Sequence, residues 1–133
     1  MDWKIERVQG ADLDLDEVLA VYRSSGLGER RPVGDRERMA TMVREANLVL
    51  VCRVDGELAG IARAVSDFSY VTYLSDIAVS GPHQRLGIGK ALIDALGAEA
   101  PRAKIVLLSA PAATDYYPHL GFTRHDSAWF RNP

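Results

Sequence analysis

Apolar and polar residues follow two periods along this chain, one typical of strands and the other of helices. Runs of β-branched and apolar residues predict strands. Asp55 and Gly56 separate two such runs and favour a tight hairpin, because a two-residue turn needs positive φ at both positions. The predicted strands are Trp3–Val8, Asn47–Val54, Leu58–Val65, Tyr70–Val79, Lys104–Leu108 and Phe122–Phe130, the last as one or two edge strands.

Helical spacing of apolar residues predicts about four helices between these strands. The first follows the acidic residues Asp12, Asp14 and Asp16, whose carboxylates suit a helix start, and it ends at Gly26 and Gly28. The other three begin near Asp35, precede Pro101 and span Thr114–Leu120. The order β-α-α-β-β-β-α-β-α-β predicts an α/β domain with a mixed sheet of six to seven strands and helices on both faces.

Composition limits the classes of function. The length of 133 residues predicts one domain, residues 1–133, with a single hydrophobic core. A formal net charge of -2 without long runs of like charge argues against a nucleic-acid partner. The one cysteine, Cys52, excludes an internal disulfide and a cysteine zinc site, and the three histidines lack metal-ligand spacing. Neither a signal peptide nor a membrane span stands out, so we expect a cytoplasmic protein with no metal and no membrane partner.

The most informative segment is Asp76–Lys90, which predicts a strand, a loop and the start of a helix. Gly87 and Gly89 leave the backbone open to a ligand, and the first helical turn offers unpaired N–H groups at the positive end of the helix dipole. Arg85 and Lys90 add two cations. The segment therefore predicts a site for phosphate or pyrophosphate, although glycine also serves an ordinary strand-to-helix turn.

Two common phosphate motifs do not fit this segment. A P-loop needs Gly where Gln84 stands and Ser or Thr where Ala91 stands. A dinucleotide fingerprint needs a third glycine where Leu92 stands, and it lies on the first strand of a βαβ unit rather than late in the chain.

A third pattern does fit. The spacing Gln84-x-x-Gly87-x-Gly89 resembles the Q/R-x-x-G-x-G/A signature of the GNAT acetyltransferase superfamily. Farther along, Asp115–Phe122 is similar to that superfamily's F-Y-x-x-x-G-F segment, and the two motifs stand in the same order. One departure is Leu86, where Arg or Gly is common. The resemblance covers nearly the whole chain.

The resemblance implies the GNAT fold, with a mostly antiparallel sheet whose central strands splay apart, and an N-acetyltransferase that uses acetyl-CoA. The splayed strands would be Tyr70–Val79 and Lys104–Ser109. Backbone N–H groups of the glycine turn would hold the pyrophosphate, and backbone groups of Ile77 and Val79 would pair with the pantetheine arm. The N–H of Ile77 would also polarise the thioester carbonyl. The positions that the resemblance assigns to acetyl-CoA are Ile77, Ala78, Val79, Gln84, Arg85, Leu86, Gly87, Ile88, Gly89, Lys90, Ser109 and Tyr117.

Direct attack of an amine on a thioester needs a proton acceptor for the amine and favours a proton donor for the thiolate. The resemblance implies Tyr117 as the catalytic acid near the CoA sulfur, whereas Tyr116 matches a position of apolar packing. Asp76 is the candidate catalytic base, directly or through water, because a carboxylate in an apolar strand needs a partner or solvent. A structural carboxylate bonded to a neighbouring loop is the alternative. His83 is expected to be an exposed turn residue.

The identity of the acceptor amine is less well specified. Arg63–Asp67 and Leu74–Ile77 resemble the branch that includes plant-type serotonin N-acetyltransferases, which implies a small aryl-alkylamine. The alternatives are acetylation of a protein lysine or N-terminus and, from another class, a CoA-binding regulatory module without turnover. A tRNA acceptor conflicts with the negative net charge. Four aromatic residues would either line an acceptor pocket or serve the core or a dimer contact: Tyr22, Phe68, Tyr70 and Tyr73.

The tail Ala128–Phe130 is apolar and lies next to the end of the sequence. Members of the superfamily are often dimers, and this tail could serve the interface of a homodimer.

Overall fold

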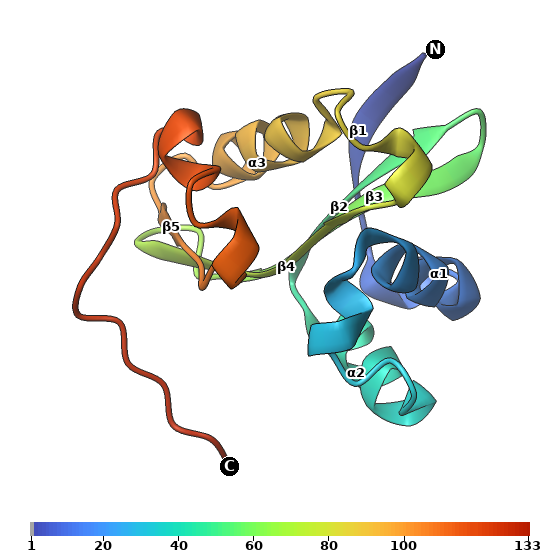
Figure 1. Cartoon of the computed structure of the whole chain (residues 1–133), viewed down its shortest axis with the longest axis horizontal. Coiled ribbons are helices and arrows are strands. Elements are labelled where there is room, and N and C mark those ends of the chain that lie inside the picture. Colours follow the sequence, from blue (N-terminus) through green and yellow to red (C-terminus); the bar gives the residue numbers. More distant parts are fainter. Residues whose placement is uncertain (1) are drawn as a thin grey trace.

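A computed structural model describes residues 2–133, and its centre is a single twisted sheet (Figure 1). Four strands pair antiparallel in chain order, and the fifth runs parallel to the fourth. The strands are β1 (Trp3–Val8), β2 (Leu48–Val54), β3 (Glu57–Ser66), β4 (Val71–Val79) and β5 (Lys104–Val106).

Three α-helices cover the sheet. Helices α1 (Leu15–Ser25) and α2 (Arg36–Glu45) lie on one face, and α3 (Ile88–Glu99) lies on the other (Figure 1). The carboxylate of Asp14 accepts hydrogen bonds from two backbone N–H groups of the first turn of α1, and Gly26 ends that helix with a φ of 91°. Both predicted boundaries of the first helix are confirmed.

Each face of the sheet has its own hydrophobic core. The side chains of α1 and α2 pack with Val49, Val51 and Ile61 on one face. The apolar side of α3, including Leu92 and Leu96, packs with alternate residues of the same strands on the other face. The two cores share the same strands because successive side chains of a strand point to opposite faces of the sheet. A strand that is buried on both faces therefore has a continuous run of apolar residues.

The hairpin prediction is also confirmed. Asp55 and Gly56 have φ values of 52° and 85°, which are the positive values that the tight turn between β2 and β3 requires.

The predicted number of strands is wrong. The described residues form five strands rather than six to seven, because Phe122–Phe130 remains without a strand partner and runs away from the sheet (Figure 1). A strand needs a hydrogen-bonding neighbour, and between Phe122 and Ala128 the segment is polar, so no apolar face holds it against its own sheet.

The predicted fourth helix is also wrong. Thr114–Leu120 does not form an α-helix; a 3-10 turn precedes it at Pro111–Ala113, and another lies at Tyr117–Leu120. Pro118 explains the break, because proline lacks the N–H that an α-helix needs and restricts the residue before it. The described residues therefore form three α-helices instead of about four.

Candidate active site

Strand β4 extends beyond its neighbour β5 and leaves an open edge. The two strands pair only from Val71 to Tyr73, so Leu74–Val79 lacks a strand on that side among residues 2–133. The sheet therefore opens between β4 and β5, which is the splay that the GNAT resemblance implied.

The backbone groups along this edge alternate in direction. The N–H of Ser80 donates to the Ala59 carbonyl of β3 at 2.8 Å, and consecutive residues of a strand point their backbone groups to opposite sides. The backbone groups of Ala78 therefore face β3, and those of Ile77 and Val79 face the open edge. An extended chain placed along the edge would meet the N–H groups of Ile77 and Val79.

Helix α3 begins beside the end of this edge. Its N-cap is Gly87, with a φ of 85°, and no side chain caps the helix. The N–H groups of Ile88, Gly89 and Lys90 therefore have no partner within the helix, and the positive end of the helix dipole lies there. A Cβ on Gly89 would lie 3.9 Å from the Val79 side chain, so the uncapped turn and the open edge adjoin.

The loop before α3 is held by its own side chains. The Gln84 amide donates to the Val79 carbonyl at 2.9 Å, which ties the loop to the end of β4 and uses one acceptor of the open edge. Arg85 adopts a left-handed φ of 67°, and both Arg85 and Leu86 are exposed. The Lys90 ammonium pairs with Asp94 at 2.6 Å. The groups free to meet a ligand are therefore chiefly the backbone N–H groups at the start of α3. The cations contribute less, because Arg85 is exposed to solvent and Lys90 is already in an ion pair.

His83 and Ser109 complete the positions named from the sequence. His83 is half-buried, and its Nδ1 lies 2.9 Å from the Ser80 hydroxyl, so it is a turn residue but not a fully exposed one. Ser109 is half-buried in the segment after β5, on the far side of the opening from β4.

Two adjacent tyrosines lie beside the uncapped turn of α3. The Tyr116 hydroxyl is the nearest neighbour of Gly89, 3.1 Å from the position of a Cβ there. The Tyr117 ring packs edge-on against Tyr116 and Phe122, with centroid distances of 5.3 and 5.6 Å. Burial raises the pKa of Tyr117, Tyr116 raises it further, and the nearby cation Arg30 lowers it in part. Tyr117 is therefore a protonated hydroxyl at neutral pH.

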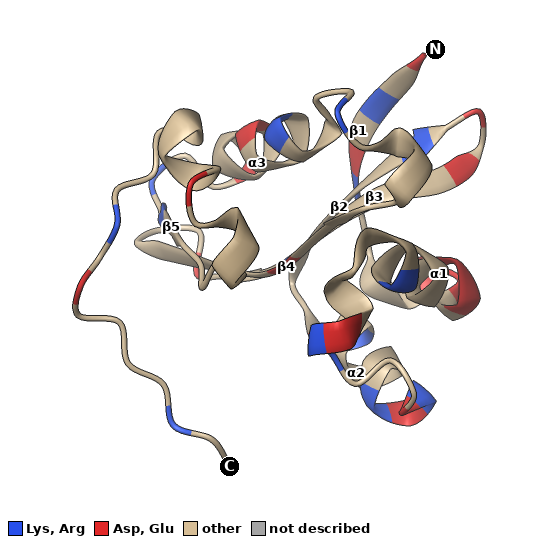
Figure 2. Cartoon of the chain, viewed as in Figure 1, with Lys and Arg blue, Asp and Glu red and all other residues tan. Residues whose placement is uncertain are grey.

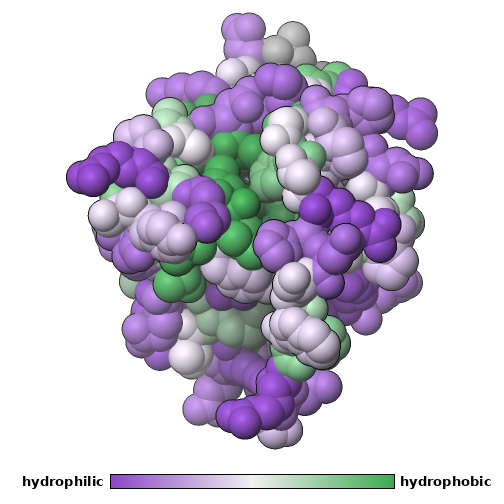
Figure 3. Space-filling view, turned by 90° about the vertical axis from the view of Figure 1, so that its left-hand side faces the viewer, coloured by the Kyte–Doolittle hydropathy of each residue, from purple (hydrophilic) through white to green (hydrophobic). Residues whose placement is uncertain are grey.

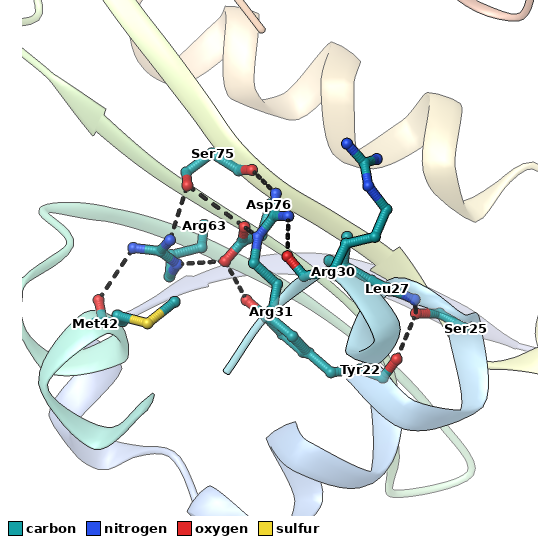
Figure 4. Close-up of polar contacts among 9 residues, drawn as sticks. All are labelled: Tyr22, Ser25, Leu27, Arg30, Arg31, Met42, Arg63, Ser75 and Asp76. Atoms are coloured by element: carbon teal, nitrogen blue, oxygen red, sulfur yellow. Dashed lines mark hydrogen bonds and ion pairs between the residues drawn. The ribbon is translucent and has the colours of Figure 1, made fainter. Parts of the chain in front are cut away.

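Asp76 is the centre of a buried cluster (Figure 4). One carboxylate oxygen accepts from Arg63 Nε at 2.6 Å and from the Tyr22 hydroxyl at 2.6 Å. The other oxygen accepts from Arg31 Nε at 2.5 Å. Arg31 also donates to the carbonyl of Ser75, and Arg63 donates to its hydroxyl, both at 2.8 Å. The cluster joins α1, β3, β4 and the segment before α2.

These contacts set the charge of Asp76. Burial raises the pKa of its carboxyl, but the hydrogen bond and charge of Arg63, with hydrogen bonds from Tyr22 and Arg31, outweigh burial and leave the pKa below its usual value. The side chain has no exposed surface. A carboxylate that is fully paired, buried and hard to protonate favours the structural alternative over the role of general base.

The partners of Asp76 were not identified from the sequence, although a signal was present. Arg63 is an isolated charge within an apolar strand, as Asp76 is, and two such charges on neighbouring strands are expected to pair. Strand register places Arg63 opposite Asp76, next to a bulge at Ser75. Tyr22 is fully buried and serves this cluster, so it does not line an acceptor pocket.

The other three aromatic candidates do not converge on one pocket either. Arg7 lies over the half-buried Phe68 ring, and Lys104 lies over the Tyr70 ring. Tyr73 is partly exposed at the last position where β4 pairs with β5.

Charges of both signs are interspersed over the helices and the β2–β3 hairpin (Figure 2). Among residues 2–133, no group of three or more potential metal ligands gathers. In the same part of the chain, no helix has the length and hydropathy of a membrane span.

A separate hollow lies between α2 and β3 on the α1 side of the sheet. It has a volume of about 620 Å³ and an apolar floor that includes Met42 and Val65. Its lining also includes three carboxylates, from Asp35, Glu37 and Glu45, and two arginines, Arg38 and Arg63.

The sequence as a whole matches a known family. A family model described as the acetyltransferase (GNAT) domain matches residues 18–132. The chain belongs to the GNAT family of acetyltransferases. It is therefore an acyltransferase whose acetyl donor is acetyl-CoA, and the uncapped α3 turn beside the open edge is a place where the residues fit that donor.

Solved structures share the fold of this GNAT domain. A GNAT-family acetyltransferase from Streptococcus pneumoniae is 18% identical, with a TM-score of 0.77 over 99% of this chain and 100% of that one. An aminoglycoside acetyltransferase from an uncultured soil sample is 23% identical, with a TM-score of 0.73 over 100% and 99%. An aminoglycoside N-acetyltransferase in complex with CoA is 17% identical, with a TM-score of 0.73 over 99% and 95%. No curated protein matches the sequence.

Replacing Asp76 with Asn tests the structural role of the cluster. We expect the free energy of unfolding to fall by about 3–5 kcal/mol, because Arg63 and Arg31 would lose their anion in a buried site. Denaturant unfolding at pH 7 measures this loss. Since the pKa of Asp76 is lowered by folding, the wild-type advantage should shrink as the pH falls below the usual pKa of an aspartate.

The exposed Asp94 provides the control. Asp94→Asn removes an ion pair at the surface of α3 and should change stability little. Equal losses in the two variants would contradict a special role for the buried carboxylate.

Proposed function

We propose that this GNAT domain transfers the acetyl group of acetyl-CoA directly to the amino group of a small primary amine. The observation that carries the proposal is the adjacency of three features: the open edge of β4, the uncapped first turn of α3 and the tyrosine pair 116–117, whose Tyr116 hydroxyl lies 3.1 Å from the Cβ position of Gly89. Acetyl-CoA supplies an activated acyl group as its thioester. The residues of the chain bind the donor, orient it and manage the protons.

The donor site uses backbone groups along its length. The N–H groups of Ile88, Gly89 and Lys90 are assigned to the pyrophosphate, because they are unpaired and lie at the positive end of a helix. The N–H groups of Ile77 and Val79 are assigned to the extended pantetheine arm. The N–H of Ile77 also faces the carbonyl oxygen on which negative charge develops during attack.

Tyr117 is assigned the role of catalytic acid. A thiolate resembles a group with a pKa of about 8.5 and leaves more readily when it receives a proton. Tyr117 retains its proton at neutral pH because burial raises its pKa, and its ring is held edge-on between Tyr116 and Phe122.

We assign water as the acceptor of the proton that the amine loses. Asp76 is assigned the role of a positioning residue for Ile77. Asp76 has no free surface and four donors within reach, three of them charged or polar side chains on other elements. Through Ser75 and the β4 bulge, it fixes the direction of Ile77 at the open edge.

The charges near Tyr117 favour an acceptor that is not a polycation. Arg30 lies close enough to lower the pKa of Tyr117, and its side chain points away from the Asp76 cluster (Figure 4). The carboxylate of Asp76 is already neutralised by two arginines. A polycation would meet the positive charge of Arg30, whereas an amine with an apolar or aromatic body would meet less repulsion, which supports an aryl-alkylamine.

A lysine side chain in a protein is the second candidate acceptor. The observation in its favour is the hollow between α2 and β3, whose lining carries three carboxylates against two arginines, one of them Arg63 of the Asp76 cluster.

Calorimetric titration tests the donor site. We expect acetyl-CoA to bind and saturate, with ATP and NAD much weaker. Gly89→Ala should weaken acetyl-CoA binding by about tenfold or more, because its Cβ would crowd the Tyr116 hydroxyl and cover the free N–H groups. Gly97→Ala, in the same helix with open space around it, should bind like the wild type. Absence of acetyl-CoA binding to the wild type would overturn the proposal.

Tyr117→Phe separates an enzyme from a CoA-binding regulatory module. We expect the turnover number to fall by about 10² or more while the Kd for acetyl-CoA stays within twofold, because only the proton donor is lost. Tyr70→Phe, at an exposed tyrosine, should keep wild-type turnover. A regulatory module would bind acetyl-CoA and show no turnover in any of the three proteins.

A panel of amines tests the acceptor class through release of the CoA thiol. Tryptamine and phenethylamine should be better acceptors than kanamycin or a lysine-rich peptide. Arg30→Glu should shift the preference toward kanamycin, because the charge facing Tyr117 changes sign. Arg102→Glu, at an exposed position after α3, should leave the preference unchanged. A wild-type preference for kanamycin or for the peptide would refute the assignment of the acceptor.

A further inference from the structure

Tyr116 carries a hydroxyl at a position where the GNAT resemblance implies apolar packing. Its ring does pack, edge-on against Tyr117 at a centroid distance of 5.3 Å. Its hydroxyl, however, lies beside the first turn of α3, 3.1 Å from the position of a Cβ on Gly89. Packing accounts for the ring alone, so the place of the hydroxyl needs an explanation of its own.

The Tyr116 hydroxyl is accessible to a ligand. The residue is 43% exposed, and no group among residues 2–133 forms a hydrogen bond with the hydroxyl. Residues 111–120 lie on the left-hand side of Figure 1, and Figure 3 shows that side of the molecule, where a hollowed apolar area is bordered by polar residues. A phenolic O–H both donates and accepts, so its whole hydrogen-bonding capacity is left for a bound molecule.

The surroundings of Tyr116 keep its hydroxyl protonated. Burial raises the pKa of Tyr116, the nearby Asp94 carboxylate raises it further, and the Lys90 ammonium lowers it in part. At neutral pH the hydroxyl is therefore a donor. Lys90 and Asp94 form an ion pair at 2.6 Å, so their charges largely cancel. A ligand at this turn meets the O–H of Tyr116 and the free N–H groups of α3, all of which favour an anionic acceptor.

We propose that the Tyr116 hydroxyl donates a hydrogen bond to the pyrophosphate of acetyl-CoA. The inference rests on the proposed function, which assigns the pyrophosphate to the free N–H groups at residues 88–90. The hydroxyl lies at the same turn, because it is the nearest neighbour of Gly89. A phosphate oxygen accepts several hydrogen bonds, and bonds to an ionised acceptor are stronger than neutral ones. The tyrosine pair then serves two parts of the donor, Tyr116 the phosphates and Tyr117 the sulfur.

Phosphorus NMR of bound CoA tests this contact without any turnover. The spectra compare saturated complexes of the wild type and of Tyr116→Phe, which keeps the packed ring and removes only the hydroxyl. We expect the pyrophosphate signals to differ between the two complexes while the 3′-phosphate signal stays in place, because only the pyrophosphate loses a donor. Tyr70→Phe, at an exposed tyrosine, should give the wild-type spectrum.

Calorimetric titration measures how much the contact contributes to affinity. Tyr116→Phe should weaken the binding of acetyl-CoA by about tenfold, because a hydrogen bond to a charged acceptor is lost. It should weaken the binding of 3′-dephospho-CoA by the same factor, since that compound retains the pyrophosphate. Turnover at saturating acetyl-CoA should stay within about twofold of the wild type, in contrast to Tyr117→Phe, because the proton donor is still present.

The outcomes separate this contact from the proposed function. Undiminished affinity of Tyr116→Phe for acetyl-CoA, or pyrophosphate signals that do not move, would overturn the contact and leave the proposed acetyl transfer standing. A loss of turnover as large as that of Tyr117→Phe would also overturn it, because Tyr116 would then act by holding Tyr117 in place. A wild type that does not bind acetyl-CoA would overturn the donor site, and the contact with it.

Discussion

The paired carboxylate of Asp76 is the constraint on which the arrangement of the site depends. A charge without solvent is tolerated only when it is neutralised and fully hydrogen-bonded. Arg63 from β3, Tyr22 from α1 and Arg31 before α2 all reach the same two oxygen atoms. Three elements that are distant in sequence must therefore meet at one point of β4. Ile77, the next residue of the strand, is held at the open edge by the same contacts.

The proposed donor site, in contrast, consists largely of backbone. The open edge of β4 and the free N–H groups of α3 depend on where the elements lie and on the lack of side chains at Gly87 and Gly89. Solved structures with 17% to 23% identity share the fold with TM-scores of 0.73 to 0.77. Many sequences can place the same backbone groups, provided that glycine stands where a Cβ would fill the space. In the proposed function, selectivity among acceptor amines would depend on side chains such as Arg30, which can change without disturbing these backbone groups.

The sequence allowed prediction of features that local patterns determine. The Asp14 cap, the Gly26 end of α1 and the hairpin at Asp55 and Gly56 each depend on residues within a few positions of one another. The glycine turn indicated the uncapped start of α3 for the same reason. The Asp76 cluster could not be assembled in this way, because strand register decides which charges face one another. Asp76 was recognised as unusual in its strand, but its partners come from residues 22, 31 and 63, and their convergence is a property of the fold.

The prediction of a sixth strand is wrong for a physical reason. Residue patterns report whether a segment is able to form a strand, whereas a strand exists only when a neighbour supplies hydrogen bonds along its length. Phe122–Phe130 ends in two aromatics that suit a sheet, yet its own β5 offers only three paired residues and stays unpaired on its outer side. The polar residues between Phe122 and Ala128 supply no apolar face to hold the segment against β5, so the capacity of its last residues to form a strand is not realised in this chain.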